Sequence, residues 1–255
     1  MVGLMLGRSR TRREGLQFLT VVTYGRTGST VLQAALNTLP GVLVRGENYG
    51  ALRGLRDYVQ SVAATSDRHH AGRPDHPWFG SARLDPAAVV DSLREHVVST
   101  LLRPNRDTRI VGFKEIRYEP GHFGDYDLLL DHLLFLNTLM PGMRYLMNVR
   151  DPQDAARSGW WPGNADALEV LATTRRWLED AATDLTDILG PGRAVCLAYE
   201  EWDEHPQVVI DAFARLGLPS NDAGVRAAVQ ARLGHGPHRD QDRERAADEG
   251  AAHGG

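Results

Sequence analysis

Cysteine is almost absent from this sequence, because only Cys196 occurs among 255 residues. A single cysteine excludes an intramolecular disulfide, and it is compatible with a reducing compartment. Long apolar runs are lacking as well, since no stretch approaches the ~20 residues that a membrane-spanning helix needs. We therefore expect no membrane partner, and the cytoplasm is the default location.

An excess of charge of one sign is also missing. The formal net charge is -4, and basic residues do not outnumber acidic ones. We therefore expect no nucleic-acid partner of the general, charge-driven kind. The N-terminus places a few apolar residues before a group of arginines, which reverses the order of a secretory signal. Residues 1 to about 15 are predicted to form a flexible leader.

Apolar segments typical of buried strands alternate with segments of helical periodicity over most of the chain. The expected strands are residues 16–23, 42–44, 109–114, 143–149 and 193–199. The expected helices are residues 30–39, 51–64, 86–102, 125–137, 168–189 and 206–216. This alternation predicts a single α/β domain over residues 16–232, with a parallel sheet flanked by helices.

Two segments lack such periodicity. Residues 65–83 are rich in His, Pro, Gly and charge, and they predict a long loop of the kind that often forms a lid or a binding segment. Residues 233–255 are charged and rich in Gly and Ala, which predicts a disordered tail. Between the loop and the next helix, Asp85 and Pro86 have the residue types expected at a helix N-cap and first turn.

A loop with the sequence YGRTGST joins the first expected strand to the first expected helix. The first N–H groups of a helix have no internal partners and the helix dipole is positive there, so this junction favours an anion. Gly25 and Gly28 allow close approach of the backbone. Ser29 and Thr30 add hydroxyl donors, and Arg26 adds a permanent charge with a bidentate fork.

The Walker A pattern G-x-x-x-x-G-K-[ST] is not satisfied by this loop, which lacks the Gly spacing and has no Lys before Ser29. An ordinary nucleoside triphosphatase is therefore disfavoured. Two alternatives stay open: an atypical P-loop kinase or other nucleotide-binding protein, and an ordinary strand-to-helix turn capped by Gly and hydroxyl groups.

Two segments together resemble a known family. Arg26-Thr27-Gly28-Ser29-Thr30 resembles the 5′-phosphosulfate loop of sulfotransferases in its carbohydrate and tyrosylprotein form. Arg150-Asp151-Pro152, with Ser158 eight residues after Arg150, is similar to the family's 3′-phosphate site. The resemblance implies a P-loop-like sheet and the donor 3′-phosphoadenosine 5′-phosphosulfate (PAPS), with the nucleotide PAP as product and no metal. It implies that the donor is bound by Arg26, Thr27, Gly28, Ser29, Thr30, Arg150 and Ser158.

The position of Arg150 fits this resemblance, since ligands of open α/β sheets bind at the carboxyl ends of strands. An ion pair between Arg150 and Asp151 at the surface is the alternative. A third segment, Tyr199-Glu200-Glu201-Trp202, is similar to a late family strand that ends in Tyr-Glu-x-Leu. This similarity would place Tyr199 near the adenosine, whereas the alternative is a tyrosine packed at the edge of the sheet.

Sulfuryl transfer needs a cation at the transferred group and a base for the acceptor hydroxyl, by analogy with phosphoryl transfer. Arg26 and Lys114 are the candidate cations, because Lys114 ends a strand expected beside the first one. Glu47 is the candidate base, since tyrosylprotein sulfotransferases have a Gly-Glu segment at this place. That family segment has two adjacent Glu residues, whereas here Asn48 follows Glu47.

Other interpretations of these residues stay open. Lys114 could be a solvated lysine beside Glu115, and Glu47 could be favoured only by a helix dipole. Histidine is the other usual base. The candidate histidines are His69, His70, His76 and His122.

The acceptor is indicated only by aromatic side chains. Trp160 and Trp161 follow Ser158 closely, and Trp78 and Phe79 lie in the long loop. These residues could form an aromatic acceptor cleft or pack a loop onto the core. We expect a small-molecule or carbohydrate acceptor, and the sequence leaves a homodimer open.

Overall fold

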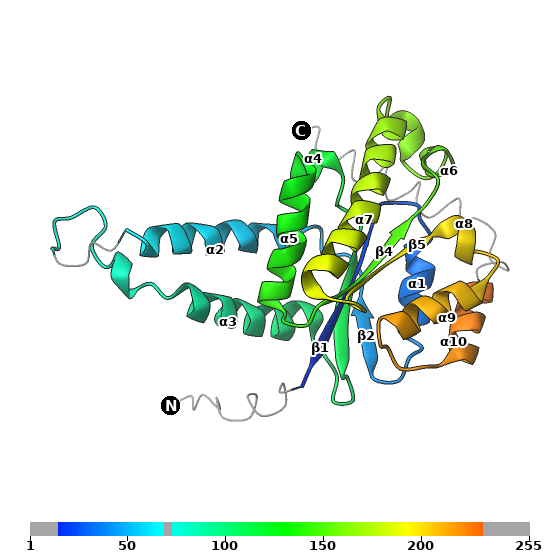
Figure 1. Ribbon diagram of the computed structural model, residues 1–255, viewed down its shortest axis with the longest axis horizontal. Helices are drawn as coiled ribbons and strands as arrows, with labels where there is room; N and C mark the ends of the chain where they lie inside the picture. Colours follow the sequence, from blue (N-terminus) through cyan, green and yellow to red (C-terminus); the bar gives the residue numbers. More distant parts are fainter. Residues whose placement is uncertain (1–14, 69–72, 232–255) are drawn as a thin grey trace, which may run out of the picture.

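A parallel sheet of five strands forms the centre of the protein, in a computed structural model that describes residues 15–68 and 73–231 (Figure 1). The strands are β1 (Gln17–Thr23), β2 (Val42–Arg45), β3 (Ile110–Glu115), β4 (Arg144–Val149) and β5 (Ala194–Ala198). Their order is β2-β3-β1-β4-β5, and every neighbouring pair is parallel. The predicted α/β class with a parallel sheet in one domain is confirmed.

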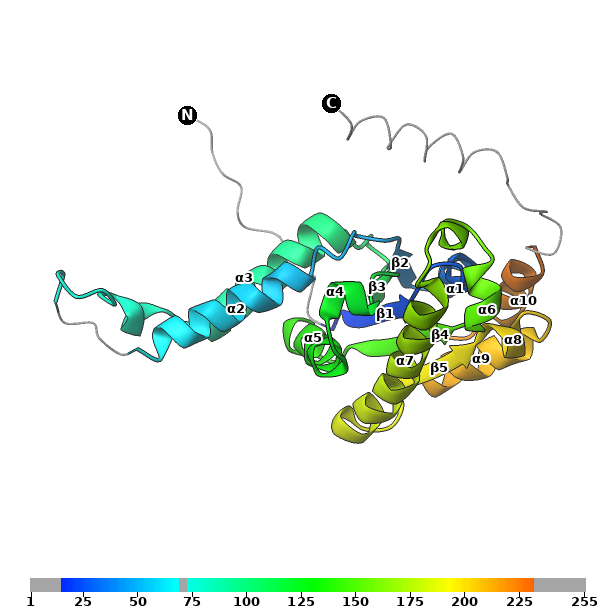
Figure 2. The ribbon, with the colours of Figure 1, turned by 90° about the horizontal axis from the view of Figure 1, so that it is seen from above.

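Helices cover both faces of this sheet. They are α1 (Ser29–Leu36), α2 (Arg53–Ser66), α3 (Pro86–Val97), α4 (Pro120–Phe123), α5 (Tyr126–Leu139), α6 (Pro152–Ala156), α7 (Ala167–Leu189), α8 (Tyr199–Trp202), α9 (Pro206–Arg215) and α10 (Asp222–Ala231). Helices α5 and α7 pack in one core cluster, and α1, α9 and α10 pack in the other (Figures 1 and 2).

The continuous apolar run of β1 follows from this two-sided cover. Phe18 and Val22 belong to the cluster on one face, and Leu19 and Val21 belong to the cluster on the other. A strand that is buried on both faces has no position for an exposed polar side chain, so its sequence shows no alternation. Because β1 is central, the loop that follows it lies at the middle of the carboxyl edge of the sheet.

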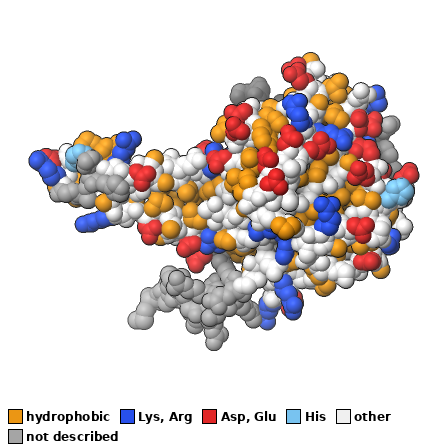
Figure 3. Space-filling view, viewed as in Figure 1, with side chains coloured by type: hydrophobic (Ala, Val, Ile, Leu, Met, Phe, Trp, Pro, Cys, Tyr) orange, Lys and Arg blue, Asp and Glu red, His pale blue; other side chains and the backbone are white. Residues whose placement is uncertain are grey.

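Helices α2 and α3 lie side by side and extend away from the sheet as an arm (Figures 1 and 2). The Asp85 side chain accepts hydrogen bonds from the backbone N–H groups of Ala87 and Ala88, so the expected cap of α3 is confirmed. The predicted loop 65–83 is partly helical, since α2 continues to Ser66 and a 3-10 turn covers Ser81–Arg83. Hydrophobic and basic side chains gather at the outer end of the arm (Figure 3).

Several elements differ from expectation. Helix α1 ends at Leu36, three residues early, and β3 extends to Glu115. Helices α4, α6 and α8 span only four or five residues, which is too short to show a period. Helix α10 was not predicted because its buried face consists of little more than Val225 and Val229.

Parts of the predicted organisation lie outside the described residues. These parts are the C-terminal tail, the leader except Gly15, and residues 69–72. Within residues 15–68 and 73–231, no helix is both long and apolar enough to cross a membrane.

Candidate functional site

The loop after β1 has an unusual backbone. Gly28 has φ +75°, and Arg26 also lies in the left-handed region, with φ +73°. A Cβ atom on Gly28 would lie 2.7 Å from the Tyr199 ring. Position 28 therefore requires glycine for two reasons: the backbone lies in the left-handed region, and the Tyr199 ring leaves no room for a Cβ atom. Helix α1 begins at Ser29, so its first free N–H groups lie at the mouth of this loop.

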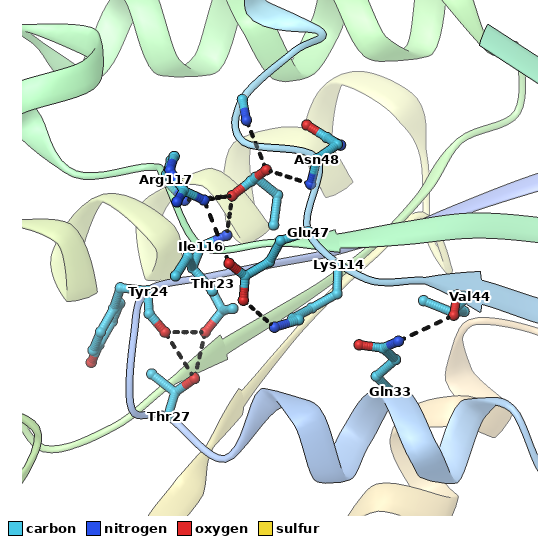
Figure 4. A network of polar contacts seen from close by, with 12 residues as sticks. Thr23, Tyr24, Thr27, Gln33, Val44, Glu47, Asn48, Lys114, Ile116 and Arg117 are labelled. Carbon is cyan, nitrogen blue, oxygen red and sulfur yellow. Dashed lines mark hydrogen bonds and ion pairs between the residues drawn. The ribbon is translucent and has the colours of Figure 1, made fainter. Parts of the chain in front are cut away.

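A buried polar network fixes the base of the loop. The Thr23 hydroxyl donates to the Asn148 carbonyl at 2.6 Å. It also lies 2.7 Å from the Thr27 hydroxyl (Figure 4). The Asn148 amide donates to the Thr27 carbonyl at 2.8 Å and accepts from the Trp202 indole at 3.0 Å. The Thr27 side chain thus points into the protein, and it supports the loop instead of facing a ligand.

Arg150 and Ser158 lie against the same loop. The Arg150 guanidinium donates to the Arg26 carbonyl at 2.9 Å, and Arg26 Nε donates to the Ser158 hydroxyl at 2.9 Å. The Tyr24 hydroxyl accepts from the Arg150 N–H at 2.8 Å and donates to the Arg150 carbonyl. Burial raises the pKa of Tyr24, so this phenol stays protonated and keeps its donor. The two segments that the sequence singled out therefore meet.

Tyr199 does not line the cleft. It is buried as the first residue of α8, with the Arg150 guanidinium 4.6 Å from its ring centroid. This geometry is a cation–π contact, which favours a fixed orientation of the arginine. The structure therefore places Tyr199 behind Arg150.

Lys114 and Glu47 form an ion pair on the other side of the loop. Lys114 Nζ lies 2.5 Å from Glu47 Oε1, and Arg117 lies 3.5 Å from the other Glu47 oxygen (Figure 4). The Lys114 side chain is 7% exposed, whereas the Glu47 side chain is 35% exposed. Lys114 is therefore not the solvated lysine of the alternative interpretation, and Glu47 stays open to a ligand.

These groups share one cleft of about 480 Å³. It is lined by Gly25, Arg26, Gly28, Ser29, Thr30, Val31, Glu47, Lys114, Ile116, Arg150, Ser158 and Trp160. The Trp160 ring packs directly over Gly25, where a Cβ atom would overlap it. Most of the predicted donor-binding residues and all three predicted catalytic residues thus face the same space.

The other aromatic candidates, and the candidate histidines among the described residues, do not line this cleft. Trp161 is buried, and Trp78 and Phe79 are exposed. His122 lies 3.5 Å from Glu119, and His76 lies in the turns before the 3-10 segment. His69 and His70 are outside the described residues. Among described residues, no group of three or more His, Cys, Asp or Glu is placed to hold a metal ion.

Sequence reasoning missed three contributors to the site. Tyr24 clamps Arg150, Asn148 supports the loop, and Arg117 contacts Glu47. Each acts through contacts with residues far away in the chain, and none of the three has a local pattern.

One overlooked signal was compositional: Lys114 is the only lysine among 29 Lys and Arg residues. A single lysine in a chain so rich in arginine is conspicuous, and its compact ammonium group can do what a planar guanidinium cannot.

Replacing Gly28 by alanine should destabilise the protein through the Tyr199 contact. Gly217→Ala is the matched control, since Gly217 also has positive φ (+64°) but has no atom within 4 Å of an added Cβ. Both variants carry the left-handed penalty, while only Gly28→Ala also displaces the ring. We expect Gly28→Ala to unfold with roughly 1–3 kcal/mol less free energy than Gly217→Ala in urea titrations. Equal unfolding free energies would contradict the tight packing behind the loop.

The chain is similar to solved structures of sulfotransferases at 13–18% sequence identity. No family model matches this sequence, and no curated protein matches it. Among solved structures, the chain is similar to a sulfotransferase domain from the Synechococcus PCC 7002 olefin synthase, with 18% identity over 82% of this chain and 76% of that one and a TM-score of 0.48. It is also similar to a sulfotransferase domain from the curacin biosynthetic pathway, with 13% identity over 84% of this chain and 77% of that one and a TM-score of 0.46.

A third similar structure is the sulfotransferase STF9 from Mycobacterium avium, with 15% identity over 88% of this chain and 69% of that one and a TM-score of 0.46. Because these TM-scores lie below 0.5, the fold class rests on the strand order described above. For the same reason, the function has to be inferred from the geometry of the cleft.

Proposed function

We propose that this protein transfers a sulfuryl group from PAPS to a hydroxyl of a small-molecule or carbohydrate acceptor. The observation that carries this proposal is that the two predicted anion-binding elements meet in one cleft. The loop with Arg26 and the β4 end with Arg150 touch through Arg26 and Ser158, although they are more than 120 residues apart. Such a pair of sites suits a nucleotide donor that carries phosphate groups at both the 3′ and the 5′ positions of its ribose.

The residues present fit this donor. The start of α1, with Ser29 and Thr30, would hold the 5′-phosphosulfate together with Arg26. Arg150 and Ser158 would hold the 3′-phosphate. Arg150 Nε is buried without a hydrogen-bond partner among the described residues, and such an atom normally has one. An anion beside Arg150 would supply it.

The remaining polar residues of the cleft can serve the transfer step. The acceptor oxygen forms a bond to sulfur while the bond from sulfur to the 5′-phosphate oxygen of the donor breaks, which leaves PAP. In this proposal the acceptor proton passes to the Glu47 carboxylate. Lys114 and Arg26 stabilise the charge that develops on the bridging and sulfuryl oxygens. Without donor, Lys114 and Glu47 neutralise each other at 2.5 Å, so the donor gives Lys114 a second anionic partner.

A thermal-shift comparison separates this function from an atypical P-loop kinase. PAP without Mg²⁺ should raise the midpoint of unfolding, because a ligand at 100 times its Kd adds about 2.7 kcal/mol to the folded state. ATP with Mg²⁺ at the same concentration should raise it much less. The opposite order, with a shift only for ATP and Mg²⁺, would favour the kinase alternative.

A further inference from the structure

Glu115 is a buried carboxylate beside the site that the proposed mechanism does not use. It is the last residue of β3, directly after Lys114, and it is 3% exposed. Successive residues of a strand point to opposite sides, so Lys114 and Glu115 reach different parts of their surroundings. Both nevertheless contact the segment that follows β2: Lys114 binds the Glu47 side chain, and Glu115 binds the backbone beyond it.

The hydrogen bonds of Glu115 connect this segment to the end of β3. One carboxylate oxygen accepts from the backbone N–H groups of Asn48 at 3.1 Å and Gly50 at 2.8 Å. The other oxygen accepts from the N–H of Ile116 at 2.8 Å, and from the N–H of Arg117 at 3.3 Å and its guanidinium at 3.0 Å (Figure 4). A single side chain thus holds the two chain segments that carry Glu47 and Arg117.

The electrostatics of Glu115 agree with a structural anchor. Burial disfavours the charged form, but the hydrogen bonds from the Gly50, Ile116 and Asn48 backbone and from Arg117 outweigh it, so the pKa of Glu115 lies below its usual range. The group is therefore ionised at neutral pH. Removing a buried hydrogen-bond acceptor of this kind leaves its donors unpaired, which is costly.

The segment held by Glu115 is itself strained. Tyr49, between the two N–H donors, has φ +59° and is 81% exposed. The Arg117 guanidinium lies over the Tyr49 ring, 3.9 Å from the ring centroid. A non-glycine residue in the left-handed region persists only where its surroundings hold it. The hydrogen bonds to Glu115 on either side of Tyr49 help to hold it, together with the Arg117 contact and the bond from the Ala51 N–H to the Asn48 side chain.

We propose that Glu115 is a positioning residue, which fixes the segment after β2 so that the Glu47 carboxylate stays between Lys114 and Arg117. This inference rests on the proposed function, because it assigns Glu115 to the same reaction. Glu115 does not line the cleft, so in this proposal it acts through the residues it positions, Glu47 and Arg117. Its loss should therefore lower turnover and leave nucleotide binding nearly unchanged.

The test uses Glu115→Gln, which keeps the side-chain volume, and Glu115→Ala, which removes all of the bonds. Glu119→Gln is the matched control, since Glu119 is also a largely buried carboxylate near the same strand end but has no hydrogen bond to the segment after β2. Amide hydrogen exchange at Asn48 and Gly50 is the readout that needs no activity. We expect at least about tenfold faster exchange in Glu115→Ala and wild-type exchange in Glu119→Gln.

Turnover supplies the second readout. Glu115→Gln should lower kcat about 10-fold or more with little change in the Kd for PAP, and it should cause no further loss in a Glu47→Gln background, because groups that act as a unit are non-additive. Additive losses would show a general structural role and overturn the proposal, as would unchanged exchange at Asn48 and Gly50. If wild type neither binds PAP nor uses PAPS, the proposed function fails, and the exchange result still decides whether Glu115 holds the segment.

Discussion

Replacing Lys114 by alanine is expected to lower kcat about 10²–10³-fold, because removal of one preorganised donor to a developing negative charge costs this much. The Kd for PAP should change much less, since PAP lacks the sulfuryl group that Lys114 is proposed to stabilise. The loss would appear in the transition state and not in nucleotide binding. Single-turnover rates with labelled PAPS, together with calorimetric titration of PAP, measure the two quantities separately.

Two further variants distinguish charge from packing at this position. Lys114→Met keeps an unbranched chain in a site that is 5% exposed, but it has no cation. It should lose as much turnover as Lys114→Ala. Lys114→Arg keeps the charge but carries a planar fork into a site that holds an ammonium group against Glu47, and it should recover only part of the rate. Wild-type turnover in Lys114→Met would show that the cation has no part in catalysis.

Replacing Arg150 by alanine should weaken PAP binding about 10- to 150-fold, because a charge-assisted hydrogen bond contributes roughly 1.5–3 kcal/mol. The effect should be specific to the 3′-phosphate. Adenosine 5′-monophosphate, which lacks this phosphate, should bind wild type and Arg150→Ala with similar affinity. The difference in affinity between the two nucleotides should thus nearly vanish in the variant, and calorimetry with both ligands measures it.

Arg157→Ala is the matched control for Arg150→Ala. Arg157 directly follows α6, and its side chain is 74% exposed. Among the described residues, its only ion pair is a 3.4 Å contact with Asp154. Exposed pairs of this kind contribute little, so PAP affinity should stay at the wild-type value. A loss of affinity for both nucleotides in Arg150→Ala would instead indicate that the variant disturbs the loop through the Arg26 carbonyl.

The sequence was most informative where a local pattern has one physical cause. The apolar run of β1 predicts a strand buried on both faces, and β1 is the central strand. Asp85 and Pro86 predict a helix start, and the side chain of Asp85 caps α3. The expectation that Lys114 lies on a strand beside the first one is confirmed, since Val21 pairs with Lys114 in the parallel register, although this strand runs one residue further, to Glu115.

Features that depend on distant contacts could not be predicted in this way. The contact of Glu47 with Lys114 spans 67 residues, and the contact of Arg26 with Ser158 spans 132. Periodicity places each residue on a strand end or loop but does not show which side chains meet. The inward turn of Thr27 likewise follows from Thr23 and Asn148, and the loop sequence alone does not contain that information.

The arm formed by α2 and α3 shows a second limit of predicting structure from the sequence. Residues 65–83 were predicted as a long loop because His, Pro and Gly are frequent there, yet α2 runs into this range and a short turn closes it. Helix α2 has no fully buried residue, and Leu55 and Val59 are only partly buried against the core, so its apolar face does not mark where the helix ends. Trp78 and Phe79 of this range are exposed and do not line the cleft, so the aromatic acceptor cleft that the sequence left open does not include them.

Calorimetric titration of PAP into the wild-type protein without Mg²⁺ tests the central claim most directly. Binding of a nucleotide with both 3′- and 5′-phosphates requires the β1 loop and the β4 end to act together in the cleft that contains Lys114 and Glu47. We predict saturable binding with one PAP per chain, and much weaker binding of adenosine 5′-monophosphate under the same conditions. No binding of PAP, or equal binding of the two nucleotides, would contradict the assignment of this cleft to PAPS.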